Sequence, residues 1–364
     1  MRRFISFRDF DWVLLGFVLV ICGLGVLEIY SATLNTKFAG FHLKQTYWIL
    51  GGVVAMFLVS LLNYQKLTEN VLWAYGASVL ALVTVALFGK KYLGARRWIQ
   101  LPGGQHFQPS EWVKLVLILA IAKYFSDLGG KEPTFKDIAK ASALVCVPML
   151  LVLKQPDLGT ALTYIPIVVV GLFLGGIRFQ HAATILVVGA IAVVPVWKWG
   201  LKPYQKQRLT NFAEPEADPR GSGYQIQQSK IAVGNGGIFG RGAAQGSQVR
   251  GEFLPIPHTD FIMAAFAEEH GFVGALGLLL LYFIVLMRLI QNAQTAPDRA
   301  GAFLVMGVVA VLTFHILVNV GMVVGLMPVT GIPLPLMSYG GSSVLFTFLA
   351  LGMVMNVRMR RFVN

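Results

Sequence analysis

The sequence predicts an all-α, polytopic membrane protein with about ten transmembrane helices and one long extracytoplasmic loop. Three observations support this fold class. Residues of the AVILMFWYC set make up 56% of the 364 residues, charged residues make up only 13%, and the mean hydropathy is +0.67. Because soluble domains carry about 25% charge, most of this chain is expected to lie in lipid.

Apolar runs occur along the entire chain, and a membrane-spanning helix needs about 20 mostly apolar residues. The candidate spans are 12–31, 46–62, 70–88, 111–125, 138–153, 158–175, 180–199, 261–288, 301–325 and 341–357. Pro156 predicts a tight hairpin between the fifth and sixth spans, since proline stops a helix. The stretch 326–340 is rich in Pro and Gly, so we expect a re-entrant or interfacial loop that is buried against protein.

The loop charges predict the orientation of these spans. Ten spans place both termini on one side, and the short loops on that side carry more Lys and Arg than those opposite. Positively charged loops favour the cytoplasm, so we expect both termini to be cytoplasmic and loops 89–110 and 201–260 to face outward. Residues 1–364 are expected to form a single integral membrane domain, with 201–260 as its large outer loop.

The net charge of +13 does not indicate nucleic-acid binding, because the Lys and Arg residues are scattered and form no binding motif. Cys22 and Cys146 lie in apolar runs and are expected to be buried thiols without a disulfide. The six histidines lack the spacing of zinc ligands, so no metal site is predicted.

The outer loop 89–110 carries four basic residues and no acid. The bases are Lys90, Lys91, Arg96 and Arg97. One interpretation is that this loop departs from the positive-inside tendency, while Tyr92 and Trp98 anchor it at the interface. The other is an anion site, because the planar guanidinium group of Arg matches phosphate.

Polar residues also begin the fourth span. Ser110 is a candidate N-cap. Glu111 and Lys114 are three residues apart and therefore share one helix face. They could form an ion pair that stabilises the bundle, or they could line a polar cavity in which Lys114 holds an anionic headgroup.

Loop 201–260 is long enough to suggest a function of its own. Residues 224–233 predict a short amphipathic helix, and the glycine run 234–242 predicts a turning loop rather than a nucleotide phosphate loop. Asp260 lies where this loop meets the eighth span. The residue types favour an N-cap at this position. A general base at the membrane–water boundary is the alternative.

The segment from Asn319 to Ser343 resembles the signature of the SEDS family (shape, elongation, division and sporulation proteins). Other segments that resemble family blocks are His258-Thr259-Asp260-Phe261, Gln155-Pro156-Asp157-Leu158-Gly159-Thr160, Pro109-Ser110-Glu111 and Gly223-Tyr224-Gln225. The resemblance covers essentially the whole chain. Val329-Thr330-Gly331-Ile332 is more similar to the elongation branch of the family than to its division branch.

This resemblance implies a peptidoglycan glycosyltransferase of the bacterial cytoplasmic (inner) membrane, which polymerises lipid II during cell elongation. It implies a class B penicillin-binding protein, other elongation-complex proteins and membrane lipids as partners. The essential aspartate of the family maps onto Asp260, which changes our expectation for this residue from a cap to a catalytic base. A lipid II flippase or transporter, and a non-catalytic scaffold for a penicillin-binding protein, remain the alternative functions.

The implied chemistry gives the basic residues a role, because the leaving group would be undecaprenyl pyrophosphate. Cations should stabilise the charge that develops on it. Our candidates are Arg96, Arg97 and Lys114, with Arg208 and Lys230 as further candidates and Glu111 orienting Lys114. A divalent cation such as Mg²⁺ or Mn²⁺ could assist, but no ligand set in the sequence predicts one.

Overall fold

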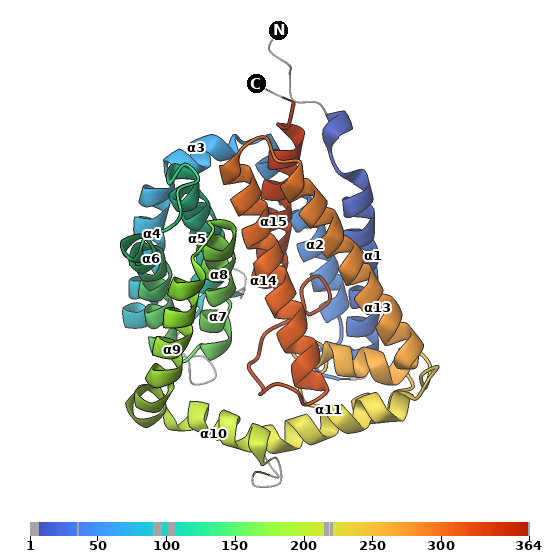
Figure 1. Ribbon diagram of the computed structural model, residues 1–364. Helices are drawn as coiled ribbons and strands as arrows, with labels where there is room; N and C mark the ends of the chain where they lie inside the picture. Colours follow the sequence, from blue (N-terminus) through green and yellow to red (C-terminus); the bar gives the residue numbers. More distant parts are fainter. Residues whose placement is uncertain are drawn as a thin grey trace.

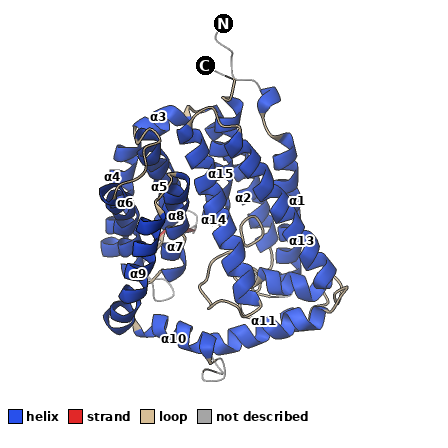
Figure 2. Cartoon of the chain, in the orientation of Figure 1, coloured by secondary structure: helices blue, strands red, loops and turns tan. Residues whose placement is uncertain are grey.

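The computed structural model describes residues 7–34, 36–89, 97–100, 106–214, 218 and 221–362, and most of this chain is helical (Figure 1, Figure 2). The first elements are η1 (Phe7–Asp9), α1 (Trp12–Thr33), α2 (Phe41–Leu61), α3 (Tyr64–Glu69), α4 (Val71–Phe88), β1 (Ile99–Gln100) and β2 (His106–Phe107). The middle elements are α5 (Pro109–Asp127), α6 (Phe135–Lys154), α7 (Leu158–Leu162), α8 (Ile165–Leu174), α9 (Phe179–Pro195), η2 (Val196–Gly200) and α10 (Pro203–Ala213). The last are α11 (Ser222–Gly236), α12 (Ser247–Arg250), α13 (Ile262–Gln294), α14 (Arg299–Val323) and α15 (Gly341–Met359).

The predicted fold class is confirmed, and each of the ten predicted spans is helical. Within the described residues, seven helices are long and apolar enough to cross a membrane: α1, α2, α4, α9 with η2, α13, α14 and α15. The other three predicted spans are α5, α6 and the pair α7–α8. The last is interrupted between Leu162 and Ile165, because Pro166 starts a new helix there and cannot continue the old one. The number of membrane crossings stays a prediction.

Helices α14 and α15 form the buried centre of the bundle. α2 lies along α15, α5 and α8 pack on α14, and α1 packs on α13. Glycine allows the closest of these approaches: a Cβ atom on Gly352 of α15 would lie 2.8 Å from the carbonyl oxygen of Met56 on α2. The centre of the molecule is therefore formed by α14 and α15, with α2 packed closely on α15 and the remaining helices around them.

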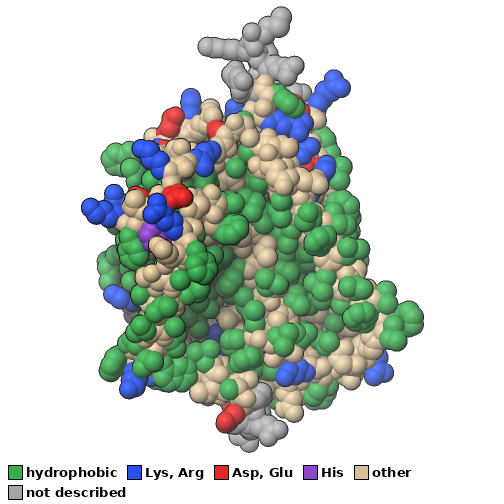
Figure 3. Space-filling model, in the orientation of Figure 1, with side chains coloured by type: hydrophobic (Ala, Val, Ile, Leu, Met, Phe, Trp, Pro, Cys, Tyr) green, Lys and Arg blue, Asp and Glu red, His purple; other side chains and the backbone are tan. Residues whose placement is uncertain are grey.

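The two ends of the bundle differ in composition. Both termini lie at one end, and α10 and α11 cross the opposite end (Figure 1). At the end with the termini, the buried carboxylate of Asp11 pairs with Arg288 of α13 at 3.2 Å and with Arg358 of α15 at 2.9 Å. Apolar side chains cover much of the middle of the face shown in Figure 3, and basic side chains gather towards the end with the termini.

Three local predictions need correction. α5 begins at Pro109 with Gln108 in the cap position, so Ser110 is not an N-cap, because the fixed φ of proline suits the first helical position. The amphipathic helix extends to Gly236, beyond the expected end at residue 233. Cys146 is an exposed thiol while Cys22 is buried; an apolar run predicts a span but does not say which face meets lipid.

The stretch 326–340 is buried against protein, as predicted. It connects α14 to α15 without forming a helix, and it buries apolar side chains that include Val329, Ile332, Leu334 and Met337. Gly331 adopts φ +74°, which favours glycine. We refer to residues 326–340 as the 326–340 loop.

Candidate active site

The 326–340 loop and α14 hold the segment that ends in Asp260. The carbonyl oxygen of His258 accepts a hydrogen bond from the backbone of Tyr339 at 2.9 Å, and that of Thr259 accepts one from the Ser338 hydroxyl at 2.7 Å. The Asn319 amide donates to the carbonyl oxygen of Asp260 at 2.9 Å. Three consecutive carbonyl groups are thus fixed, so the position of Asp260 is determined by distant parts of the sequence.

Asp260 does not cap α13. The cap position is occupied by Phe261, and no side chain makes a capping hydrogen bond there. The Asp260 side chain is partly exposed. Desolvation in its crowded surroundings raises the pKa of Asp260, while the charges of Arg97 and Arg208 and a hydrogen bond with Thr259 lower it. The cap interpretation of Asp260 is therefore wrong, and its carboxylate is available for chemistry.

The neighbouring histidine is not a second candidate base. His258 is buried between Phe38, Phe41 and Tyr339, whose ring centroids lie 4.8, 5.6 and 6.1 Å from its own. Burial lowers the pKa of His258 to about 4. Its imidazole is neutral at pH 7 and serves the aromatic packing beneath the Asp260 segment.

A second carboxylate, that of Asp157, completes the charged part of the site. Its Oδ1 lies 3.6 Å from Nη1 of Arg97, and Asp157 is one of the charges that act on Asp260. Asp157 caps α7 by accepting a hydrogen bond from the backbone of Thr160 at 3.2 Å. Arg97 therefore interacts electrostatically with two carboxylates, those of Asp157 and Asp260, which are far apart in the sequence.

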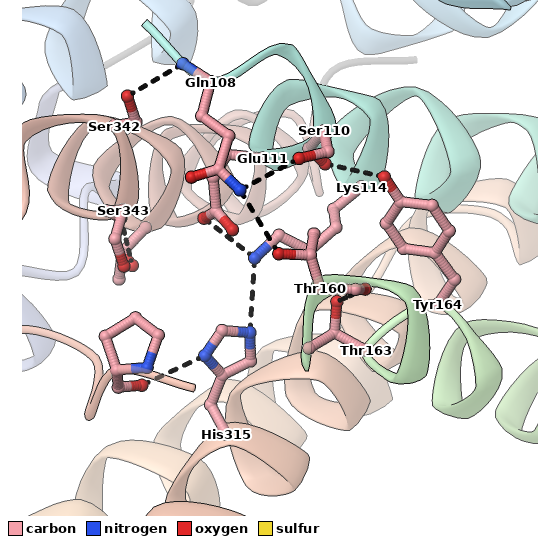
Figure 4. Close-up of polar contacts among 12 residues, drawn as sticks. Gln108, Ser110, Glu111, Lys114, Thr160, Thr163, Tyr164, His315, Ser342 and Ser343 are labelled. Carbon is pink, nitrogen blue, oxygen red and sulfur yellow. Dashed lines mark hydrogen bonds and ion pairs between the residues drawn. The ribbon is translucent and has the colours of Figure 1, made fainter. Parts of the chain in front are cut away.

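Gln108 links Asp157 to the start of α5. Its side-chain amide donates to Asp157 Oδ2 at 2.7 Å and to the Ser110 hydroxyl at 3.1 Å. Its backbone N–H donates to the Ser342 hydroxyl of α15 at 3.3 Å (Figure 4). The residue that precedes α5 thus joins three separate elements at one place.

The ammonium group of Lys114 lies inside the bundle, between the Glu111 carboxylate and the His315 ring (Figure 4). It is 2.9 Å from Glu111 Oε2 and 3.2 Å from His315 Nε2, and it lies 4.0 Å from the centre of the Phe346 ring. The Lys114 side chain is 0% exposed. Of the two interpretations, this geometry is that of the buried ion pair; contact between Lys114 and a headgroup would require a rearrangement.

The other predicted basic residues have different positions. Arg97 and Arg208 act on Asp260, and both are partly exposed. Lys230 is exposed on α11 and lies against Gly325 at the end of α14, and it is not among the charges that shift the pKa of Asp260. Arg96 lies outside the described residues, as do Lys90 and Lys91.

Two positions that matter were not predicted as site residues. Asp157 was noted only within a family-like block, and Asn319 only as the start of the signature segment. The family-like block and the signature segment are both visible in the sequence, but neither shows which residues contact one another in the folded protein. Among the described residues, the side chains that could hold a metal ion are Glu28, Glu269 and His270, which are separate from the set around Asp260.

This arrangement combines a partly exposed carboxylate of raised pKa with two guanidinium groups. The carboxylate can accept a proton from a bound hydroxyl group. The guanidinium groups can hold a phosphate or pyrophosphate group beside it. The site is thus suited to transfer reactions in which a hydroxyl group attacks and an anion leaves.

Comparisons with known proteins find the same family over nearly the whole chain. The family model FTSW_RODA_SPOVE, described as a cell cycle protein, matches residues 11–362. Peptidoglycan glycosyltransferase RodA of Treponema pallidum is 33% identical, over 97% of this chain and 98% of that protein. Peptidoglycan glycosyltransferase MrdB of Escherichia coli K12 is 39% identical, over 85% of each chain. Stage V sporulation protein E of Bacillus subtilis is 36% identical, over 95% of this chain and 96% of its own length.

Solved structures show the same similarity. A chain from a study of a peptidoglycan synthase complex that coordinates polymerization and crosslinking superposes with a TM-score of 0.85, at 34% identity, covering 98% of this chain and 99% of that chain. The rod shape determining protein RodA of Thermus thermophilus superposes with a TM-score of 0.73, at 32% identity, covering 98% of both chains.

Proposed function

This chain belongs to the FtsW/RodA/SpoVE (SEDS) family, and on that premise we propose that it is a peptidoglycan glycosyltransferase of the RodA type. The observation that supports a role for named residues is that the charges of Arg97 and Arg208 both act on the carboxylate of Asp260, which directly precedes Phe261 and α13. The substrate we propose is lipid II, which provides both an acceptor hydroxyl group and a pyrophosphate leaving group.

In the proposed reaction, the 4-hydroxyl group of the acceptor sugar attacks the anomeric carbon of the donor strand. A new glycosidic C–O bond forms, the bond from that carbon to undecaprenyl pyrophosphate breaks, and the leaving group takes the electron pair. Asp260 accepts the hydroxyl proton as general base. A carboxylate whose pKa is raised towards the working pH is a stronger base for this purpose than an ordinary one.

Arg97 and Arg208 are the cations proposed to hold the leaving pyrophosphate. Preorganised charges that face developing negative charge give one of the largest contributions to catalysis. Asp157 lies 3.6 Å from Arg97 as an ion pair, and this contact keeps the guanidinium group in place. The buried Lys114–Glu111 pair is a positioning element for the start of α5, which carries Gln108 and Ser110.

We also propose that a transpeptidase of the class B penicillin-binding type is the partner, and that both termini face the cytoplasm while Asp260 faces outward. The first proposal is supported by the similarity to a chain from a peptidoglycan synthase complex. The second is supported by the excess of Lys and Arg in the short loops on the side of the termini, and by the position of the termini at the end of the bundle opposite α10 and α11.

The test is lipid II polymerisation by purified protein, with Asp260→Asn compared with wild type. Loss of a general base should lower the rate by about 10²–10⁴-fold. Glu252→Gln is the matched control, because Glu252 is an exposed carboxylate of the same long loop and should keep wild-type activity. Parallel reactions with Mg²⁺, Mn²⁺ and EDTA test whether a divalent cation assists.

The outcomes separate the candidate functions. Glycan strands from wild type but not from Asp260→Asn support the proposal. Wild-type rates from Asp260→Asn would exclude the base assignment. Translocation of labelled lipid II across proteoliposomes without strands would indicate a flippase, and neither strands nor translocation would indicate a scaffold.

A further inference from the structure

A second cluster of ionisable side chains lies away from Asp260, between α1 and α13. It contains Glu28 of α1 and the adjacent Glu269 and His270 of α13, and the atoms that these residues could offer as ligands all lie within 4.8 Å of one another. Glu28 and Glu269 are only 1% and 2% exposed. The sequence alone does not reveal this cluster, because Glu28 is far from the other two residues in the chain.

The Glu28 carboxylate is the unusual member of this cluster. Among the described residues, neither of its oxygen atoms has a hydrogen-bond donor. Nδ1 of His270 lies 3.8 Å from Glu28 Oε2, which is too far for a hydrogen bond. A buried carboxylate without a partner is costly, so such a group is normally paired or bound to a metal ion.

The neighbours of Glu28 make its position less favourable still. Glu269 accepts hydrogen bonds from the Ser31 hydroxyl and from the backbone of Ala244. Glu268, which is 0% exposed, accepts from Ser247 and from the backbone of Gln248. These neutral donors add no positive charge, and no Lys or Arg of the described chain forms an ion pair with any of the three acids. A cation is what the cluster lacks.

We propose that Glu28, Glu269 and His270 bind a divalent transition-metal ion. Two carboxylates and one imidazole are a mixed ligand set that suits Zn²⁺ and Mn²⁺, whereas Mg²⁺ prefers oxygen ligands alone. Three protein ligands would leave a coordination position for water. The His270 ring is held by stacking on Phe266, with 4.3 Å between the ring centroids.

An ion can reach this cluster from outside. Glu269 lines a pocket of about 400 Å³, which also borders on Ser31, Ala244 and Arg250. The pocket lies between the end of α1 and the segment that includes α12. In our proposal the ion approaches the Glu269 carboxylate through this pocket, so metal exchange does not require the helices to separate.

Metal binding here would have a definite structural consequence. It would tie α1 to the first segment of α13, which begins directly after Asp260 and Phe261 and ends at Gly271, where φ is +68° and the helix is kinked. The ion would therefore stiffen the part of α13 next to the candidate active site without touching the site itself.

The experiment is metal binding by the full-length, tag-free protein in detergent after removal of metals with EDTA. Bound metal is measured by mass spectrometry, and the thermal unfolding midpoint is followed during titration with Zn²⁺, Mn²⁺ or Mg²⁺. We expect a stoichiometry of about one ion, affinity in the order Zn²⁺ above Mn²⁺ above Mg²⁺, and a rise in the midpoint, since a ligand of the native state stabilises it.

Two variants test the ligands separately. Glu28→Gln should weaken Zn²⁺ binding by at least about 100-fold, because the loss of even an outer partner of a ligand costs 10–100-fold. In EDTA it should unfold at the same or a higher temperature than wild type, since it removes an unpaired buried carboxylate. His270→Gln should weaken binding similarly, and this variant should fold normally because the His270 side chain is 39% exposed.

Glu252→Gln is the matched control, because Glu252 lines the same pocket but is not in the cluster. It should bind Zn²⁺ like wild type. The proposal is overturned if wild type binds no Zn²⁺ or Mn²⁺, or if Glu28→Gln and His270→Gln bind as tightly as Glu252→Gln does.

Discussion

Opposing influences set the protonation of Asp260, and they can be separated by changing one residue. Burial raises its pKa, while the positive charge of Arg97 lowers it. A general base works only when deprotonated, so activity should fall as the pH drops through this pKa. Arg97→Ala removes a charge that favours the carboxylate; the pKa should rise, and the acid limb of kcat/KM should move to higher pH by up to about one unit.

The measurement for Arg97 is a pH–rate profile of lipid II polymerisation. The rate of Arg97→Ala should also fall at every pH, because Arg97 is proposed to hold the pyrophosphate. Arg97→Lys keeps the charge and loses the fork of donors, so it should lower the rate with little movement of the acid limb. An unchanged acid limb in Arg97→Ala would refute the electrostatic link to Asp260.

The Lys114–Glu111 pair should matter mainly for stability. Both side chains are buried, so Lys114→Ala leaves an uncompensated carboxylate in the bundle and should cost about 3–5 kcal/mol of stability. The double variant Glu111→Gln/Lys114→Met removes both charges and should recover most of that loss. Thermal unfolding in detergent measures both effects.

The activity of the double variant then shows whether Lys114 does more than stabilise. Polymerisation near the wild-type rate would agree with a positioning role. A folded but inactive double variant would show that Lys114 acts on substrate directly. A Lys114→Ala protein that unfolds at the wild-type temperature would contradict the buried-pair interpretation.

At the scale of elements, the sequence predicts the helices well and their interruptions poorly. All ten apolar runs are helical in the structure, because a helix satisfies its own backbone hydrogen bonds in an apolar environment. The break between α7 and α8 was missed, although Pro166 signals it, because the apolar run continues through it. The kink at Gly271 gave no signal, because a glycine in an apolar helix is common. In the structure, Gly271 lies close to the backbone of Ile238 and Gly240, where a side chain would not fit.

Asn319 of α14 holds the backbone of the candidate base, Asp260, in place. Its side-chain amide donates to the carbonyl oxygens of Asp260 and Ile332, at 2.9 and 2.8 Å, and so joins the start of α13 to the 326–340 loop. Asn319→Ala should displace Asp260 slightly. A displacement of about 1 Å at a reacting group can cost about 10²-fold, so we expect kcat to fall by 10–100-fold.

The acid limb of the pH profile should not move in Asn319→Ala, because no charge near Asp260 has changed. Asn70→Ala is a suitable control, since Asn70 is an exposed residue in the connection between α3 and α4 whose amide donates only to the Lys66 carbonyl group. Equal rates for the two variants would show that Asn319 does not position Asp260.

At the scale of the whole molecule, the candidate site is a meeting point of distant segments. Arg97 precedes α5, Asp157 caps α7, Arg208 lies on α10, and Asp260 precedes α13. Sequence reasoning found Arg97, Arg208 and Asp260 from charge and family resemblance. It could not pair Arg97 with Asp157 or exclude Lys230 from the charges around Asp260, because these relations depend on how the helices pack.

The packing of the helices also predicts which loops lie on the same side of the membrane, and two labelling sites test this prediction. Loop 128–134 belongs to the end with the termini: its Gly130 lies against Arg299, next to Asp298, which accepts a hydrogen bond from Tyr64 at 2.7 Å. Lys131 is exposed in this loop, and Glu252 is exposed in the long loop before Asp260. If the termini are cytoplasmic, these two residues lie on opposite sides of the membrane.

In intact cells, a membrane-impermeant maleimide should therefore label Glu252→Cys and leave Lys131→Cys unlabelled until the cells are permeabilised. The background should be Cys146→Ser, because Cys146 is exposed on α6 whereas Cys22 is buried. Labelling of Lys131→Cys alone in intact cells would reverse the orientation. It would also place Asp260 in the cytoplasm, where it could not polymerise a substrate displayed on the outer face.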